Sequence, residues 1–141
     1  MAPHDGYVVV HGGAGMHGHA REKEVKQALR LACKEALKGL HDPSPDHGDS
    51  SKCTPLNMVG NAIVVLEDDP HLNAGYGSNL SLIGTVECDA AIMDGASGYF
   101  GSVGAVSGIK NPIQLARVVL EYSRIPDPLG RIPPLYEYFS L

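Results

Sequence analysis

Two apolar segments joined by a tight turn constrain the fold of this chain more than any other feature. Residues 86–93 and 99–107 are mostly apolar, and Asp94-Gly-Ala-Ser-Gly98 between them is typical of a β-hairpin turn. The stretches 88–93 and 103–106 are nearly continuous apolar runs, and strands of that kind are usually covered on both faces. The sequence therefore predicts a hairpin in a sheet that needs a layer on each side.

Helices are predicted on both sides of the polar segment in the first half of the chain. Residues 20–40 carry apolar side chains at steps of three or four, opposite Lys and Glu, which predicts an amphipathic helix. Residues 56–67 are apolar almost all round and predict a buried helix. A third helix is predicted to run to about Ser123, with Asn111 as its N-cap and Pro112 as its first residue.

The remaining segments complete a mixed α/β (α+β) prediction. Residues 7–10 form a short apolar run that predicts a buried strand, and 41–55 is a Pro- and Asp-punctuated surface loop. The predicted helices suffice to cover one face of the sheet only. We therefore expect residues 1–141 to be a single, partial domain.

Charge and cysteine content narrow the classes of partner and compartment. The formal net charge is −5, which leaves no overall electrostatic footprint for nucleic acid or an anionic membrane. No apolar run approaches the length of a membrane span, and the first residues do not resemble a signal peptide. The three cysteines lack paired spacing, so we expect reduced thiols and a cytoplasmic or nuclear location.

Two motifs suggest ligands that their surroundings do not favour. Residues 13–18 fit the G-x-G-x-x-G pattern, but no second parallel strand with a terminal acid follows the next helix, as a dinucleotide site needs. A tight turn or a backbone cradle for a reacting group is favoured instead. Several histidines and one cysteine lack the regular spacing of a zinc site, and solvated loop residues explain them better: His11, His17, His19, His41, His47 and Cys53.

Three acidic residues leave two interpretations open. Glu87 and Asp89 share one face of the predicted strand, with Cys88 opposite, and Asp94 begins the turn. Such carboxylates are suited to acid–base catalysis, or they accept hydrogen bonds from nearby turn amides, because a charged group on a buried strand must be satisfied.

Three stretches together resemble one family: residues 10–15 (VHGGAG), 66–79 (LEDDPHLNAGYGSN) and 87–95 (ECDAAIMDG). They are similar to the plant-type asparaginase and isoaspartyl peptidase family of N-terminal nucleophile (Ntn) hydrolases. The resemblance spans about residues 7–134. Within the family, residues 77–79, 107–112 (SGIKNP) and 130–134 (GRIPP) most resemble the threonine aspartase, or taspase, branch.

This resemblance implies a four-layer αββα sandwich, of which the present chain is an incomplete half. It implies a precursor that cleaves its own backbone and frees a threonine, whose hydroxyl attacks an amide carbonyl while its α-amine acts as base. The partners implied are the β-subunit half of the same precursor, a protein or β-aspartyl substrate, and a second αβ unit in a homodimer.

No catalytic residue is expected in this chain. Its only threonines are Thr54 and Thr85. Although Gly84-Thr-Val86 copies the Gly-Thr-Val around the family's nucleophile, it directly precedes Glu87, at a turn that the family places in its α-subunit. A smaller departure is Asn57, where the family usually has aspartate.

The resemblance assigns two supporting roles to residues that are present. Gly12 and Gly13 match glycines that position the nucleophile. The loop 66–76 resembles one that binds a structural sodium ion, the only cofactor implied, through backbone carbonyls, which suit a hard cation. By position, the carbonyl donors are Leu66, Glu67, Asp69, Leu72, Ala74 and Tyr76.

The sequence thus favours the N-terminal portion of a threonine aspartase-like endopeptidase that cuts after aspartate and is activated by autoproteolysis. Two alternatives stay open. One is the corresponding portion of an asparaginase or isoaspartyl peptidase, and the other is an inactive, truncated copy that acts as a binding partner.

Overall fold

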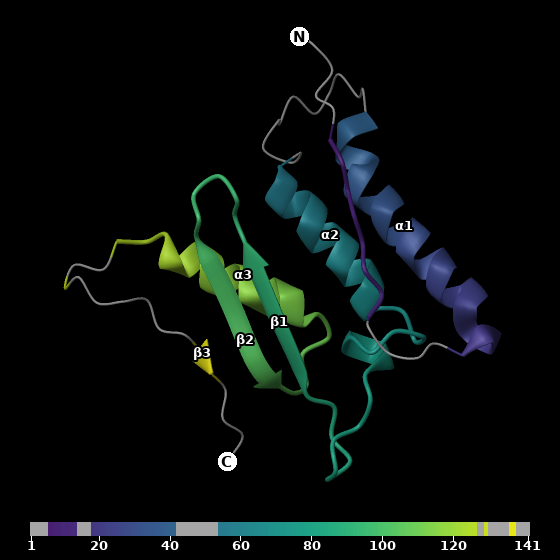
Figure 1. Ribbon diagram of the computed structural model, residues 1–141. Helices are drawn as coiled ribbons and strands as arrows, with labels where there is room; N and C mark the ends of the chain where they lie inside the picture. The colour runs from purple at the N-terminus through teal and green to yellow at the C-terminus, as the bar shows by residue number, and fades with distance from the viewer. Residues whose placement is uncertain (1–5, 14–17, 42–53, 127–128, 130–135, 138–141) are drawn as a thin grey trace.

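The computed structural model describes residues 6–13, 18–41, 54–126, 129 and 136–137, and the description below concerns these residues. They form a mixed α/β structure (Figure 1). Its elements are, in chain order, the 3₁₀ helix η1 (His19–Arg21), α1 (Glu22–His41), α2 (Pro55–Glu67), the 3₁₀ helix η3 (Gly75–Gly77), β1 (Cys88–Met93), β2 (Phe100–Val106), α3 (Pro112–Ser123) and β3 (Tyr136–Glu137).

The sheet has the order β1-β2-β3 and contains the predicted hairpin. Strands β1 and β2 are antiparallel, with Met93 opposite Phe100 and Cys88 opposite Val106. The register shifts between Cys88 and Ala90, where Ala105 has a φ of 50° and its N–H donates to Asp89 Oδ1 at 2.7 Å. Strand β3 pairs with β2 in parallel, and this short element was not predicted from the sequence.

Two apolar clusters hold the helices and the sheet. The first joins α1 to α2 through Val25, Ala28, Ala32, Ala36, Ala62 and Leu66, together with Leu72 of the following turn. The second joins α3 to β1 and β2 through Ile92, Val103, Val106, Ile113, Ala116, Val119 and Leu120. Ile63 of α2 packs against both clusters, so α2 links the two parts of the molecule.

Helix α3 lies very close to the sheet at Gly101. A Cβ at this position would lie 2.2 Å from the carbonyl oxygen of Ala116 and 2.5 Å from the backbone nitrogen of Leu120. Only glycine allows the backbones of β2 and α3 to approach this closely.

The three predicted helices are confirmed, with two corrections in detail. Thr54 caps α2 by accepting the Asn57 N–H at 3.2 Å, and the helix is only partly buried, because Val59 is 49% exposed. Asn111 precedes α3 as predicted, but its side chain makes no cap hydrogen bond to the helix, so the predicted N-cap interaction is wrong. The Asn111 amide donates to Asp68 instead.

The two end residues of the predicted loop 41–55 belong to the neighbouring helices. His41 belongs to α1 and Pro55 is the first residue of α2, while residues 42–53 lie outside the described part of the chain.

Residues 7–10 are not the buried strand that their composition predicted. They are extended, but Tyr7 is 92% exposed and Val9 is 93% exposed, while Val8 and Val10 pack against the α1–α2 cluster. The segment runs beside α1 and α2 (Figure 1) and pairs with no strand among the described residues. An extended apolar segment needs a neighbouring strand to bury its second side, and the described residues do not supply one.

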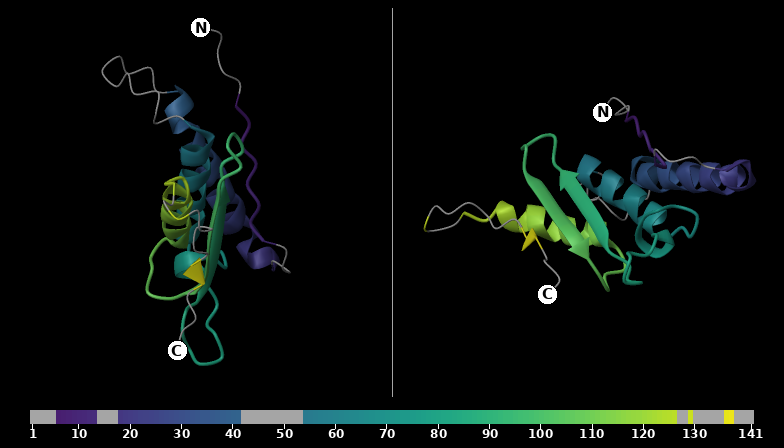
Figure 2. Two further views of the ribbon diagram at one scale, coloured as in Figure 1. Left: turned by 90° about the vertical axis from the view of Figure 1, so that its left-hand side faces the viewer. Right: turned by 60° about the horizontal axis from the view of Figure 1, so that its bottom comes forward.

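The described residues cover only one face of the hairpin. Burial alternates along β1, with Ile92 buried and Met93 62% exposed, and α3 lies against the covered face (Figure 2). Phe100, opposite Met93, is 47% exposed. The uncovered face thus presents apolar side chains to water, as the nearly continuous apolar runs predicted.

We expect the 141-residue chain on its own to associate through this face. Each Å² of apolar surface removed from water stabilises the associated form by about 25 cal/mol. Size-exclusion chromatography with light scattering should show species larger than a monomer. The variant Met93→Lys/Phe100→Lys should shift the distribution towards monomer, whereas Val118→Lys, an exposed position on α3, should not. A monomer for the unmodified chain would contradict the expectation.

Candidate functional site

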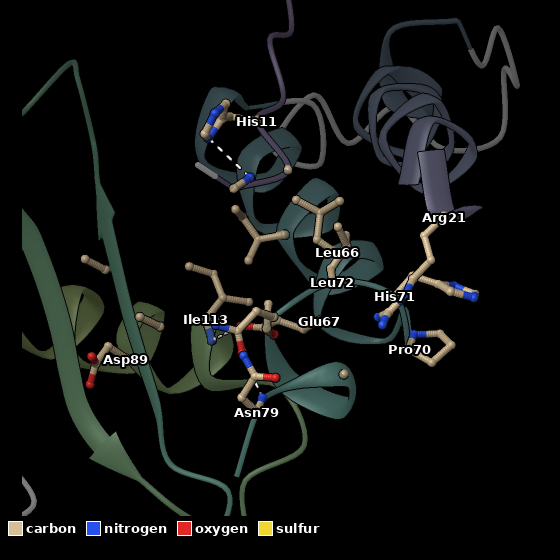
Figure 3. A pocket seen from close by; sticks show the side chains of 18 residues that line it. His11, Arg21, Leu66, Glu67, Pro70, His71, Leu72, Asn79, Asp89 and Ile113 are labelled. Atoms are coloured by element: carbon tan, nitrogen blue, oxygen red, sulfur yellow. Dashed lines mark hydrogen bonds between the residues drawn. The ribbon is translucent and has the colours of Figure 1, made fainter. Parts of the chain in front are cut away.

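A pocket of about 620 Å³ separates the end of the N-terminal extended segment from strand β1 (Figure 3). His11, Gly12 and Gly13 line one side, and residues 89–91 line the other. The remaining wall combines α2, the turn after it and the start of α3: Ile63, Leu66, Glu67, Pro70, His71, Leu72, Asn73, Ala74, Gly77, Asn79 and Ile113, with Arg21 of η1. The pocket therefore brings together the first two of the three family-like stretches and the start of the third.

The two glycines predicted to position a nucleophile both line this pocket, for different structural reasons. Gly13 has a φ of 106°, which side chains rarely permit, and its N–H donates to His11 Nδ1 at 3.4 Å. A Cβ at Gly12 would lie 3.2 Å from Leu29 and 3.4 Å from Val25, so Gly12 allows the segment to pack closely on α1. Their predicted role beside a threonine stays a prediction.

The turn after α2 folds back on itself around two glycines. A Cβ at Gly77 would lie 2.3 Å from the carbonyl oxygen of Leu72 and 2.7 Å from that of Asp69. Gly75 has a φ of 53°, and a Cβ there would lie 2.4 Å from the carbonyl oxygen of Glu67. Side chains at these two positions would collide with backbone, so the turn depends on both glycines.

This geometry fits the predicted carbonyl site for a hard cation in part. The Leu72 and Asp69 oxygens converge on one point, and oxygen donors of this kind suit sodium. Two of the other predicted donors already accept hydrogen bonds, the Leu66 oxygen from the Asp69 N–H at 3.4 Å and the Ala74 oxygen from the Gly77 N–H at 3.2 Å. Within the described part of the chain, no cluster of three or more His, Cys, Asp or Glu side chains could hold a metal ion.

Glu67, the last residue of α2, carries a buried carboxylate that the sequence analysis did not single out as a side chain. It is 4% exposed, and its Oε1 accepts the Ile113 N–H at 2.9 Å, which satisfies one of the free amides at the start of α3. Its Oε2 is buried and accepts no hydrogen bond from the described residues. Burial raises the pKa of Glu67, and the hydrogen bonds from Ile113 and Asn111 oppose that rise.

Asp68 adds a second connection between the same two helices. Its carboxylate accepts hydrogen bonds from Asn111 Nδ2 at 3.1 Å and from Lys110 Nζ at 3.1 Å. The Asn111 hydrogen bond is the main reason that the pKa of Asp68 lies below its usual value. Two adjacent carboxylates at the end of α2 therefore fix the segment that starts α3.

The three acids on and near the hairpin have structural hydrogen bonds. Glu87 accepts from Thr85, and Asp89 accepts the Ala105 N–H. Asp94 accepts from Ser97 at 2.7 Å and from the Ala96 N–H at 3.1 Å, and Arg124 of the α3 C-cap also donates to it. The Ser97 hydrogen bond is the main reason that the pKa of Asp94 is lowered. The structure thus favours turn and bulge stabilisation over paired catalytic acids.

Thr85 is held within a turn. Its hydroxyl donates to Glu87 Oε1 at 3.0 Å and lies 2.8 Å from Ser81 Oγ, and its backbone nitrogen is a peptide N–H that donates to Ser81. A threonine that acts through its own α-amine needs that amine free. Thr85 therefore lacks the feature that such a nucleophile requires.

The described histidines do not form a metal-binding cluster. His11 and His71 both line the pocket, and His71 lies 3.2 Å from Asp69 Oδ1. His19 lies on the solvent side of η1 near Glu22. His17, His47 and Cys53 lie outside the described residues.

No described helix is long and apolar enough to cross a membrane.

The described residues form a mixed α/β structure with a pocket lined in part by Gly12 and Gly13. Comparison with known proteins identifies the family of this chain. A family model described as "Asparaginase" matches residues 4–125. The chain is 44% identical over 115 residues to the isoaspartyl peptidase/L-asparaginase of Mus musculus, covering 81% of this chain and 32% of the mouse protein. It is 42% identical over 115 residues to the plant-type L-asparaginase of Pyrococcus abyssi, covering 81% of this chain and 34% of that protein.

A longer match extends to the plant-type L-asparaginase of Pyrobaculum calidifontis. It is 36% identical over 146 aligned residues, covering 94% of this chain and 46% of the relative. The chain therefore belongs to the plant-type asparaginase family, whose members are threonine-type Ntn hydrolases. It spans about one third to one half of the length of these relatives.

Removal of the Glu67 carboxylate should destabilise the fold. The variant Glu67→Ala leaves the buried Ile113 N–H without its acceptor and should lower the free energy of unfolding by about 1–3 kcal/mol. Glu67→Gln keeps an acceptor oxygen and should cost less. Urea denaturation monitored by circular dichroism measures both, and equal losses for the two variants would contradict the role of this hydrogen bond.

The pH dependence of the free energy of unfolding tests the same carboxylate, by comparison of the unmodified chain with Glu67→Gln. Because burial raises the folded-state pKa of Glu67 above 4.5, its contribution to stability is complete below that pH and declines as the pH rises through the folded-state value. The unmodified chain should therefore gain stability relative to Glu67→Gln as the pH is lowered towards 4.5.

Proposed function

We propose that this chain is the N-terminal, α-subunit portion of a threonine-nucleophile amide hydrolase of the asparaginase and isoaspartyl peptidase kind. The observation that carries the proposal is the 44% identity over 115 residues to an isoaspartyl peptidase/L-asparaginase. The pocket lined by His11, Gly12 and Gly13 supports it, because a glycine-lined cavity admits a reacting group close to the backbone. The substrates are then asparagine or β-aspartyl peptides.

The second half of the protein supplies the nucleophile and completes the sandwich in this proposal. Strand β1 is an edge of the described sheet, and residues 6–13 are extended without a strand partner among the described residues. The pocket lies between them. A strand from the β-subunit half that enters here would pair with exposed backbone groups and bring its first residue next to Gly13. A further layer would cover Met93 and Phe100.

Threonine aspartase is the second candidate. Residues 77–79 and 107–112 resemble that branch, as do residues 130–134, which lie outside the described part of the chain. The relatives compared above carry the names of asparaginases and isoaspartyl peptidases. For that reason the asparaginase assignment takes precedence here over the endopeptidase that the sequence motifs favoured.

In the complete protein, the variant Gly13→Val should prevent self-cleavage and hydrolysis. Valine is unfavourable at a φ of 106°, and its side chain would enter the pocket. Gly18→Val is the matched control, since Gly18 has a φ of −60° and no atoms near the position of a Cβ. A denaturing gel reports self-cleavage, and asparagine, a β-aspartyl dipeptide and an aspartate-containing protein serve as substrates in parallel.

The three substrates separate the candidates. Release of ammonia from asparagine, or of aspartate from the β-aspartyl dipeptide, supports the asparaginase proposal, whereas cleavage of the protein after aspartate alone would replace it with threonine aspartase. Absence of self-cleavage and of all three activities in the unmodified complete protein would favour the inactive copy and refute both enzyme assignments.

We also propose that the turn at residues 66–76 binds sodium through backbone carbonyls. The complete protein should then melt at a higher temperature in sodium chloride than in choline chloride of equal ionic strength. Gly77→Ala should abolish that difference, because its Cβ would displace the Leu72 and Asp69 oxygens. Gly95→Ala, at a site with no atoms near the position of a Cβ, should keep it. A difference that survives Gly77→Ala would count against the site.

A further inference from the structure

The solvent side of α1 carries a row of basic side chains, although the chain as a whole has a net charge of −5. Lys23, Lys26, Arg30, Lys34 and Lys38 follow one another at steps of three or four residues, and all are exposed. These steps place them on one side of the helix, opposite the side that packs on α2. We call these five residues the basic stripe. It contains five of the 11 Lys and Arg residues of the chain.

Most of this charge is not neutralised within the molecule. Lys26 pairs with Glu22 and Lys38 pairs with Glu35, but no ion pair joins Lys23, Arg30 or Lys34 to any described residue. Lys26, Arg30, Lys34 and Lys38 are successive i,i+4 neighbours of like charge, an arrangement that destabilises a helix. Helix stability therefore does not explain the stripe.

The cationic groups also surround a common hollow. Lys23, Lys26 and Arg30 line a surface depression of about 310 Å³, together with His19 and Glu22. Three basic side chains thus lie around one depression that contains a single carboxylate. A partner's carboxylate placed in it would meet several donors at once, which strengthens an exposed ion pair beyond an isolated contact.

We infer that the basic stripe is a docking surface for an acidic polypeptide segment. The match is one of charge: α1 offers a single row of cations, and a row of carboxylates on one extended or helical segment would complement it. The proposed function makes no use of this surface, so the inference stands apart from it.

The width of the stripe favours a narrow partner over a nucleic acid. Carboxylates border it on both sides, with Glu22 along one edge and Glu24 and Glu35 along the other. The broad, uniformly charged surface of a nucleic acid would meet these acids as well as the stripe. α1 also contains no aromatic residue within its described side chains on which bases could stack.

A membrane surface fits less well for a different reason. An amphipathic helix binds lipid by burying its apolar side in the interface. The apolar side of α1, which includes Val25, Ala28 and Ala32, is already buried against α2. Leu31, 52% exposed, is the large apolar side chain that the described part of α1 leaves for such an insertion.

The test uses the complete protein and a fluorescein-labelled peptide of Glu and Ala with Glu at every fourth position. The peptide is about 16 residues long, the length of residues 23–38. Fluorescence anisotropy should show binding that weakens as salt is added. The triple variant Lys23→Ala/Arg30→Ala/Lys34→Ala should weaken binding about tenfold. Alanine favours helix, so α1 should stay folded in this variant, as circular dichroism would check.

Two control variants keep the interpretation specific. Lys23→Arg/Lys34→Arg retains the charge and should retain binding. Gln27→Ala alters an exposed, uncharged residue next to the basic stripe and should have no effect on binding. Binding that the triple variant leaves unchanged would overturn the inference. So would tighter binding to a single-stranded oligonucleotide or to phosphatidylserine vesicles than to the peptide.

Discussion

The buried carboxylate of Glu67 makes the contact on which the arrangement of the two apolar clusters depends. It ends α2, accepts the Ile113 N–H at the start of α3, and leaves its other oxygen buried without a hydrogen bond from the described residues. Burial of a carboxylate is unfavourable and raises the pKa of Glu67, and the amide of Ile113 offsets part of that cost. Asp68 reinforces the link through Asn111 and Lys110. The α1–α2 cluster is thereby fixed to the cluster of α3 and the sheet.

The turn after α2 lies beside the same contact. The chain turns back after Glu67, and Gly75 and Gly77 permit this by letting their backbone come close to Glu67, Asp69 and Leu72. The carbonyl oxygens that face inward are a consequence of that reversal. The pocket, the turn and the buried acid are therefore one structural unit.

The exposed apolar side chains and the strand edge without a partner also bear on how much of a domain this chain forms. Met93 and Phe100 are exposed, and among the described residues the outer edge of β1 and residues 6–13 have no strand partner. A domain usually buries or pairs such features. They agree with the fact that the chain spans about one third to one half of the length of the relatives compared. The exposed side of α1 differs from them, because most of its side chains are charged.

Local sequence patterns determined the helices, the hairpin and the family. The 3.6-residue periodicity of α1, the apolar run of α2 and the turn at residues 94–98 act within a few residues of one another, so a single sequence suffices to predict them. The roles of Gly12 and Gly13 came from the family resemblance, whereas the close backbone approaches at Gly75 and Gly77 were not predicted. Only the tertiary structure decided which distant segments form hydrogen bonds or pack together. Glu67 replaced Asn111 as the cap of α3, residues 7–10 stayed exposed on one side, and β3 paired with β2. Each outcome depends on contacts between segments far apart in the chain, which local sequence patterns do not encode.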